Sequence, residues 1–189
     1  VTAPPRPAGR KQRLTATRIG DFASDLAVPV VLTPSRLRSP ESIEAVVELQ
    51  PDLLILADYG QIVPAALLDL PYGALNLHPS LLPRYRGATP IPAAILAGDV
   101  ETGVTLMRMD VGLDTGPIVA QSRMSLAGTE TAPALEERLS LAAGALLDYL
   151  RSLKKSDLPQ IRDQQPLRAG RPLVVDDVTL RNLEVLESA

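Results

Sequence analysis

The sequence contains no cysteine, no tryptophan and a single histidine, His78, among its 189 residues. Without cysteine the chain cannot form disulfide bridges, thiolate zinc sites or a cysteine nucleophile. One histidine is too few for a zinc site built from several histidines, so we expect no bound metal. Aromatic residues make up only 3% of the chain, which argues against the base-stacking surfaces of single-strand nucleic-acid binders.

Long uninterrupted apolar runs are missing as well. The longest candidates, Ala65–Leu70 and Pro90–Ala97, are far shorter than the roughly 20 residues that a membrane span requires. Residues 1–20 contain no apolar run of the kind that marks a secretory signal. We therefore expect no membrane partner, and the absence of cysteine favours a reducing, cytoplasmic setting.

The composition predicts one folded domain with a basic amino-terminal end. Hydrophobic residues make up 46% of the chain, which excludes disorder of the whole sequence. Residues 1–20 carry five basic and no acidic side chains, whereas the chain as a whole has a net charge of −3. A basic arm on an acidic body suggests contact with a polyanion, although charge alone is equally compatible with a solvated, flexible terminus.

Short apolar runs typical of strands alternate with helical patterns along the chain. A serine before a proline, Ser39-Pro40, is typical of a helix start. The alternation indicates an α/β domain, for which we expect a Rossmann-like, open, mainly parallel sheet with helices on both faces. The predicted strands are Val28–Leu32, Leu53–Ala57, Ala74–His78, Val104–Met109 and Ile118–Gln121, and the predicted helices are Pro40–Glu48, Pro64–Leu70, Pro90–Ala97 and Pro133 to about Lys154.

The carboxy-terminal part has a different composition. Residues 155–172 are polar and rich in proline, which predicts a linker. Leu173–Leu186 alternates weakly between apolar and polar residues and could form a strand pair that belongs to another unit. We therefore predict a domain at 1–154, a linker at 155–172 and a tail at 173–189.

Asn76 and His78 are two residues apart on a predicted strand, so their side chains project from the same face. They stand at the carboxyl end of that strand, where open parallel sheets bind ligands. An amide donor beside an imidazole can stabilise a developing oxyanion. The spacing alone favours the alternative, in which the two side chains cap the strand end and hydrogen-bond its loop.

The segment Asp110–Gly116 reads D-V-G-L-D-T-G between two predicted strands. Its glycines allow a tight turn that could carry Asp114 toward a neighbouring strand end. There a carboxylate could orient the histidine or relay protons, although an ordinary aspartate-rich turn is the alternative. Arg84 and Arg86 could hold an anionic substrate or simply cover their loop.

Together, these motifs resemble the folate-dependent formyltransferase family. The similarity lies in Asn76-x-His78, in the following P-S-L-L-P-R-Y-R-G and in G-L-D-T-G, and it extends from Val1 to about Leu153. Asn76, His78 and Asp114 match that family's catalytic set in order and context. The resemblance implies the formyltransferase fold without its first strand and G-T-P-E-F loop, and makes residues 173–189 a candidate remnant of a carboxy-terminal β domain.

The resemblance also implies a reaction and its partners. We expect transfer of a formyl group from 10-formyltetrahydrofolate to the α-amino group of methionyl initiator tRNA, in translation initiation, by a monomer. The alternatives are a related enzyme acting on a sugar-nucleotide or ribonucleotide amine, or an inactive, degenerate relative. The folate site would comprise Tyr59, Gly60, Gln61, Ile62, Ser80, Leu81, Leu82, Pro83, Asp110, Gly112 and Leu113, and the tRNA site Arg6, Arg10, Lys11, Arg13, Arg84 and Arg86.

One residue of the expected folate site departs from the family pattern. Asp58 stands where the family usually has a small residue. If its side chain pointed inward, an unpaired charge would lie near the folate, and burying such a charge is costly.

Overall fold

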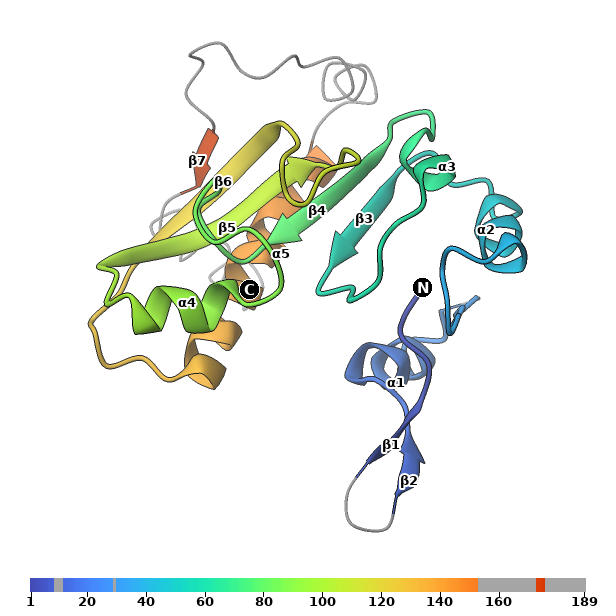
Figure 1. The fold of residues 1–189 in the computed structure, drawn as a ribbon, viewed down its shortest axis with the longest axis horizontal. Coiled ribbons are helices and arrows are strands. Elements are labelled where there is room, and N and C mark those ends of the chain that lie inside the picture. The colour runs from blue at the N-terminus through green and yellow to red at the C-terminus, as the bar shows by residue number, and fades with distance from the viewer. Residues whose placement is uncertain (9–11, 29, 153–172, 176–189) are drawn as a thin grey trace.

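The computed structural model describes residues 1–8, 12–28, 30–152 and 173–175 (Figure 1). Helices and strands alternate through most of these residues, which confirms the α/β class. The strands are β1 (Arg6–Ala8), β2 (Arg13–Thr15), β3 (Leu54–Ala57), β4 (Ala74–His78), β5 (Glu101–Arg108), β6 (Ile118–Ser125) and β7 (Leu173–Val175), and the helices are α1 (Arg18–Asp25), α2 (Pro40–Val47), α3 (Ala65–Leu68), α4 (Pro90–Leu96) and α5 (Ala132–Ser152).

The main sheet has the strand order β3-β4-β5-β6-β7. The β3–β4 and β6–β7 pairs are parallel, but the β4–β5 and β5–β6 pairs are antiparallel. The sheet is thus mixed, and the prediction of a mainly parallel sheet was wrong in this respect. The loop at residues 109–117 is too short for a crossover connection, which takes about a dozen residues or more, so β6 must return antiparallel to β5.

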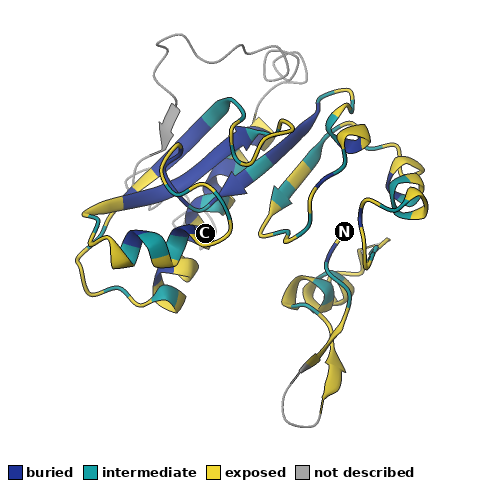
Figure 2. Cartoon of the chain, viewed as in Figure 1, coloured by how far each residue is buried: buried dark blue, intermediate teal, exposed yellow. Residues whose placement is uncertain are grey.

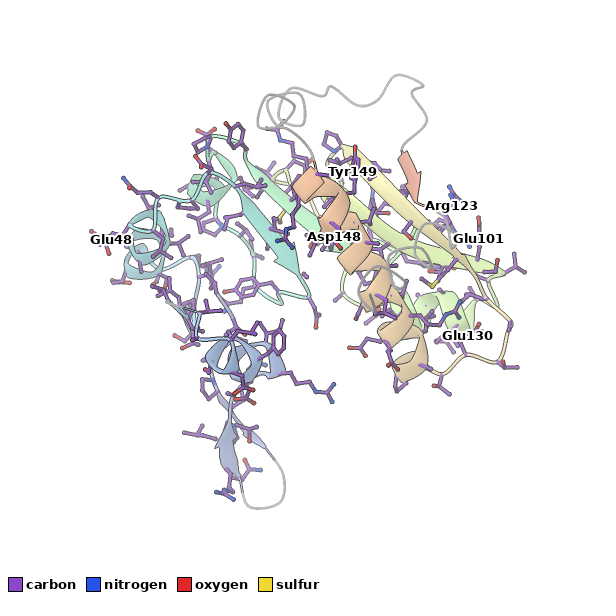
Figure 3. The ribbon with its side chains drawn as sticks, turned by 180° about the vertical axis from the view of Figure 1, so that it is seen from behind. Glu48, Glu101, Arg123, Glu130, Asp148 and Tyr149 are labelled. Carbon is purple, nitrogen blue, oxygen red and sulfur yellow. The ribbon has the colours of Figure 1, made fainter. Side chains whose placement is uncertain are left out.

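The long helix α5 covers one face of this sheet (Figure 3). Its apolar stripe includes Leu135, Leu139 and Leu146, which pack against Leu75 and Leu106 of β4 and β5. All five side chains are almost completely buried, and the dark blue of β4, β5 and β6 in Figure 2 marks this core. The predicted helical stripe is therefore confirmed, and it forms the larger of the two apolar clusters.

A second cluster covers the opposite face at the β3 end. Val46 of α2 and Leu67 of α3 pack there with Leu37 and with Leu56 of β3. Strand β3 contributes Leu54 and Leu56 to this second cluster, whereas β4 contributes Leu75 and Leu77 to the first. Helices therefore lie on both faces of the sheet, as predicted.

Several predicted boundaries shift for identifiable reasons. Ser39 caps α2 by accepting a hydrogen bond from the Ser42 backbone N–H at 3.3 Å, as predicted. Strands β5 and β6 are longer than their apolar runs because they pair with each other from Glu101 to Met107, so the ladder continues into polar residues. Helix α3 is shorter than predicted, ending at Leu68.

The predicted strand Val28–Leu32 was wrong. Residues 28 and 30–32 have no regular secondary structure, and residue 29 lies outside the described residues. Leu32 accepts one backbone hydrogen bond from Thr2 at 2.9 Å, but no ladder follows. A strand is stabilised by its paired neighbours, and the proline at position 29 has no N–H to contribute to a ladder.

The amino-terminal residues form a unit that projects away from the main sheet (Figure 1). β1 and β2 pair as an antiparallel hairpin in which Arg6 faces Thr15, and α1 follows directly. At the other end of the chain, β7 pairs with β6 and so extends the main sheet. The rest of the predicted linker and tail, residues 155–172 and 176–189, lies outside the described residues.

Candidate active site

A cavity of about 600 Å³ opens at the carboxyl ends of the parallel strands β3 and β4. This is the edge at which α/β sheets bind ligands. Its walls come from the two strands, from the loop after β3 and from the β5–β6 loop. The lining residues are Leu56, Asp58, Tyr59, Gly60, Gln61, Ile62, Val63, Ala65, Leu68, Asn76, Leu77, His78, Pro79, Gly87, Ala88, Pro90, Met107, Met109, Asp110, Val111, Gly112, Leu113 and Asp114.

Strand β4 presents Asn76 and His78 to this cavity from one face. The antiparallel register places Asn76 opposite Met107 and His78 opposite Thr105 of β5. None of the residues that the structure describes forms a hydrogen bond with the side-chain amide of Asn76. An amide N–H₂ that is free in a cavity can donate to a ligand oxygen.

The His78 imidazole is buried between two hydrogen-bond acceptors. Its Nε2 lies 2.8 Å from the Tyr85 carbonyl oxygen, and a carbonyl can only accept, so Nε2 carries a proton. Its Nδ1 lies 3.7 Å from Oδ2 of Asp114. Nδ1 therefore faces the carboxylate but lies beyond direct hydrogen-bond distance of it.

The β5–β6 loop carries Asp114 to His78. Asp110 organises this loop by accepting from the Gly112 N–H at 2.9 Å and from the Thr115 hydroxyl at 2.8 Å. Asp114 itself has a φ of +51°, and its Oδ2 accepts from the Gly87 N–H at 2.7 Å. The carboxylate is therefore held in place by a backbone donor as well as by the loop.

Tyr59 brings an unsatisfied hydroxyl close to the cavity. Its oxygen is buried and has no hydrogen-bond partner within the described part of the chain, and burial raises the pKa of the Tyr59 phenol. A buried polar group without a partner is costly, and a bound ligand can supply the missing bond.

Comparisons with known proteins identify the family of this chain. A family model described as formyl transferase matches residues 1–148, most of the chain. The chain belongs to the formyl transferase family. Formyl transferases also appear among similar solved structures. A phosphoribosylglycinamide formyltransferase from Anaplasma phagocytophilum has a TM-score of 0.68 at 26% identity, with 85% of this chain and 80% of that chain covered.

Curated relatives in the family are more similar in sequence. A methionyl-tRNA formyltransferase from Dehalococcoides mccartyi is 43% identical, with 86% of this chain and 52% of the relative covered. One from Geobacter metallireducens is 44% identical, with 92% and 56% covered. The chain thus spans about half the length of the curated relatives it matches. A sugar N-formyltransferase from Shewanella has a TM-score of 0.59 at 26% identity, over 85% of this chain and 62% of that one.

Most residues predicted for the folate site of this formyl transferase line the cavity. They are Tyr59, Gly60, Gln61, Ile62, Asp110, Gly112 and Leu113. Asp58 also lines the cavity, but its side chain is exposed. Its carboxylate is therefore solvated, and the cost of burying an unpaired charge does not arise. Gln61 has a structural task, because its amide accepts from the Leu37 N–H and donates to the Pro34 carbonyl.

The four other predicted folate residues, Ser80–Pro83, do not line the cavity. Ser80 is completely buried, and its carbonyl accepts from the Thr105 hydroxyl at 2.6 Å. The Leu82 N–H donates to the same hydroxyl, and the Leu82 carbonyl accepts from Gln121. These bonds hold Ser80–Pro83 in the core, so that Pro79 and the end of the loop from Gly87 line the cavity and the residues between them do not.

Met107 and Met109 line the cavity without having been predicted to do so. They alternate with Arg108 along β5 and its continuation, and this alternation is visible in the sequence. Placing them required the antiparallel register of β5 on β4, which no local pattern reveals.

The residues predicted to bind tRNA fall into three groups. Arg6 and Arg13 lie on the projecting hairpin, where the register puts them on one face. Arg84 donates to Asp99 at 2.7 Å, whereas Arg86 has no ion-pair partner among the described residues. Arg10 and Lys11 lie outside the described residues.

Two further expectations concern metals and membranes. Within residues 1–8, 12–28, 30–152 and 173–175, no cluster of His, Asp and Glu side chains could hold a metal ion. In the same ranges, no helix is both long and apolar enough to span a membrane.

Proposed function

We propose that this formyl transferase moves a formyl group from 10-formyltetrahydrofolate to the α-amino group of methionyl initiator tRNA. The observation that carries the proposal is the convergence of Asn76, His78 and Asp114 at one cavity. The names of the curated relatives, at 43–44% identity, support the choice of acceptor. A tRNA substrate would place the reaction in the cytoplasm.

The cavity has the size and chemistry to hold the folate. Its volume of about 600 Å³ lies within the range of about 300–1,000 Å³ that is common for small-molecule sites. Leu56, Val63 and Met109 supply apolar walls for a flat ring. The unpartnered Tyr59 hydroxyl and the backbone of the loop at Asp110–Asp114 offer polar groups for its edge.

When bound, the folate supplies the formyl carbon. The reaction forms a bond between the amine nitrogen and that carbon, breaks the bond from the carbon to N10 of the folate, and moves one proton from the amine to N10. Asn76, free of protein partners within the described structure, would donate to the formyl oxygen as negative charge develops there. A preorganised donor of this kind acts without reorganisation during the reaction.

His78 and Asp114 would stabilise developing charge and transfer protons. His78, held by the Tyr85 carbonyl and facing Asp114, would help to stabilise the negative charge that develops on the formyl oxygen. Asp114, fixed by the Gly87 N–H, can accept the proton that the amine loses and pass it on through water. Such general acid–base transfer typically contributes about 10²–10⁴-fold in rate.

The basic hairpin supports a polyanionic acceptor. Arg6 and Arg13 share one face of it, and neither has an ion-pair partner within the described ranges. Unpaired guanidinium groups on a projecting element can bind phosphates directly.

A formyl-transfer assay with three acceptors tests the proposal. We expect turnover with methionyl initiator tRNA and none with glycinamide ribonucleotide or an amino-sugar nucleotide. Turnover with one of the small amines alone would assign the chain to the activities named for its structural neighbours. Failure with all three, in a chain that melts cooperatively, would contradict the proposal.

A further inference from the structure

The loop between β4 and α4 holds a residue in a strained backbone conformation beside the catalytic histidine. Tyr85 has a φ of +55°, in the left-handed region that costs a residue with a side chain about 1–2 kcal/mol. Its carbonyl oxygen is the acceptor for His78 Nε2 at 2.8 Å. The orientation of the histidine therefore depends on whatever holds Tyr85 in this conformation.

The side chains of Arg84 and Asp99 hold Tyr85 from outside the cavity. The Tyr85 hydroxyl donates to Oδ2 of Asp99 at 2.7 Å, and Arg84 donates to Oδ1 of Asp99 at 2.7 Å. Arg84 also donates to the Tyr85 hydroxyl and lies over the Tyr85 ring, 5.1 Å from its centre. We call this group of Arg84, Tyr85 and Asp99 the Asp99 latch.

The latch has a rigid base. Asp99 follows the end of α4, where Gly98 has a φ of +65° and the Asp99 N–H donates to the Ala94 carbonyl. Its side chain is only 10% exposed, and hydrogen bonds to a shielded carboxylate are stronger than neutral ones. The hydrogen bonds to Asp99 also raise the pKa of both Arg84 and Tyr85.

The same loop contacts both His78 and Asp114. The Tyr85 carbonyl accepts from His78, and two residues later the Gly87 N–H donates to Asp114. A shift of this short segment would therefore move His78 and Asp114 relative to each other. None of Arg84, Tyr85 and Arg86 lines the cavity.

We propose that Tyr85 and Asp99 are positioning residues that set the geometry of the His78–Asp114 pair through the Tyr85 carbonyl. The inference rests on the proposed function, in which His78 and Asp114 act during formyl transfer. It assigns the Tyr85 hydroxyl and the Asp99 carboxylate a task outside the folate cavity.

The test compares Tyr85→Phe and Asp99→Asn with the wild type in the full chain. We expect kcat to fall about tenfold with KM nearly unchanged, because a misplacement of 1 Å costs up to about 10²-fold while the cavity wall stays intact. His78 is the single histidine of the sequence. In ¹⁵N-histidine spectra we expect the protonated Nε2 signal of the wild type to broaden or to move toward the Nδ1-protonated form in both variants.

Glu101→Gln provides the matched control. Glu101 pairs with Arg123 at 3.1 Å in another carboxylate–arginine contact, on β5 and β6 (Figure 3). This variant should leave kcat and the histidine signals unchanged. Wild-type kcat and wild-type signals in both latch variants would overturn the inference, as would an equal change in the control.

The histidine spectra need no substrate and separate this inference from the proposed function. If the wild type transfers formyl to no acceptor, the proposed function fails, while the spectra still decide whether the latch positions His78. A purely structural latch would lower the melting temperature of Tyr85→Phe and leave its histidine signals in place, and that result would also overturn the inference.

Discussion

At the scale of single residues, the chemistry depends on which hydrogen-bonding groups already have partners. His78 is held through Nε2 by the Tyr85 carbonyl, and Asp114 is held by a backbone donor. Asn76 has no side-chain partner among the residues described. A group that is engaged keeps its orientation, whereas one that is free can respond to a ligand. The site thus combines two oriented groups with one available donor.

Asn76 offers a direct test at this scale. We expect Asn76→Ala to lower kcat by about 10²–10³-fold, the usual cost of removing one oxyanion donor. The melting temperature should hardly change, because the side chain gives up no hydrogen bond to the described residues. Steady-state formyl transfer and a thermal melt measure the two effects. Turnover at the wild-type rate would remove Asn76 from the proposed mechanism.

At the scale of helices and strands, the short turns decide where functional groups lie. The loop after β5 must return tightly for Asp114 to reach His78, and Gly116 allows this because a Cβ there would overlap the Arg108 carbonyl oxygen. A substitution at Gly116 would therefore disturb the β5–β6 loop as a whole. Proximity to a neighbouring backbone, rather than a positive φ, explains this glycine.

Two other glycines isolate the effect of backbone conformation on stability. Gly98 and Gly144 both have open space where a Cβ would lie, but Gly98 has a φ of +65° and Gly144 lies inside α5. We expect Gly144→Ala to raise the free energy of unfolding by about 0.4–1 kcal/mol. Gly98→Ala should lower it by about 1–2 kcal/mol, because alanine is strained in the left-handed region.

Urea denaturation at a fixed temperature measures both variants. Because neither new methyl group meets a neighbour, the difference between them reports φ alone. Equal effects of the two substitutions would show that the turn at Gly98 relaxes to an ordinary conformation.

At the scale of the whole molecule, the basic hairpin and the cavity lie in different parts of the structure. The basic hairpin projects from the body that contains the cavity (Figure 1), and most of its surface is exposed (Figure 2). A projecting basic element can meet a large polyanion while a small substrate occupies the cavity. The separate positions of the hairpin and the cavity are consistent with the proposed acceptor, which is much larger than the folate.

The hairpin predicts how binding responds to salt. We expect Arg6→Gln with Arg13→Gln to weaken binding of methionyl initiator tRNA and to reduce the slope of log K against log salt by about two, one for each lost phosphate contact. Filter binding between 50 and 200 mM salt, at roughly the concentrations where such slopes are measured, provides the measurement. Arg123→Gln, which removes a paired arginine on β6, should leave the slope unchanged. An unaltered slope in the double variant would exclude the hairpin from tRNA binding.

Local patterns in the chain were sufficient for much of this picture. The alternation of apolar runs predicted α5 and β4, and the spacing of Asn76 and His78 predicted their common face, because both follow from the geometry of a single element. Ser39 predicted its own cap for the same reason. The failure at Val28–Leu32 shows the limit, since a strand needs a partner that its own residues do not encode.

Contacts between segments that are distant in the sequence determined the features that local patterns did not predict. The antiparallel register of β5 on β4 brings Met107 beside Asn76 and sets the β5–β6 loop so that Asp114 reaches His78. Buried bonds from Thr105 and Gln121 hold Ser80–Pro83 in the core and away from the cavity. The contact of Arg84 with Asp99 likewise joins residues of two separate elements. Residue types and their spacing therefore predicted which side chains carry the proposed chemistry. Its assembly depended on contacts between distant segments, whose energies no local window of sequence contains.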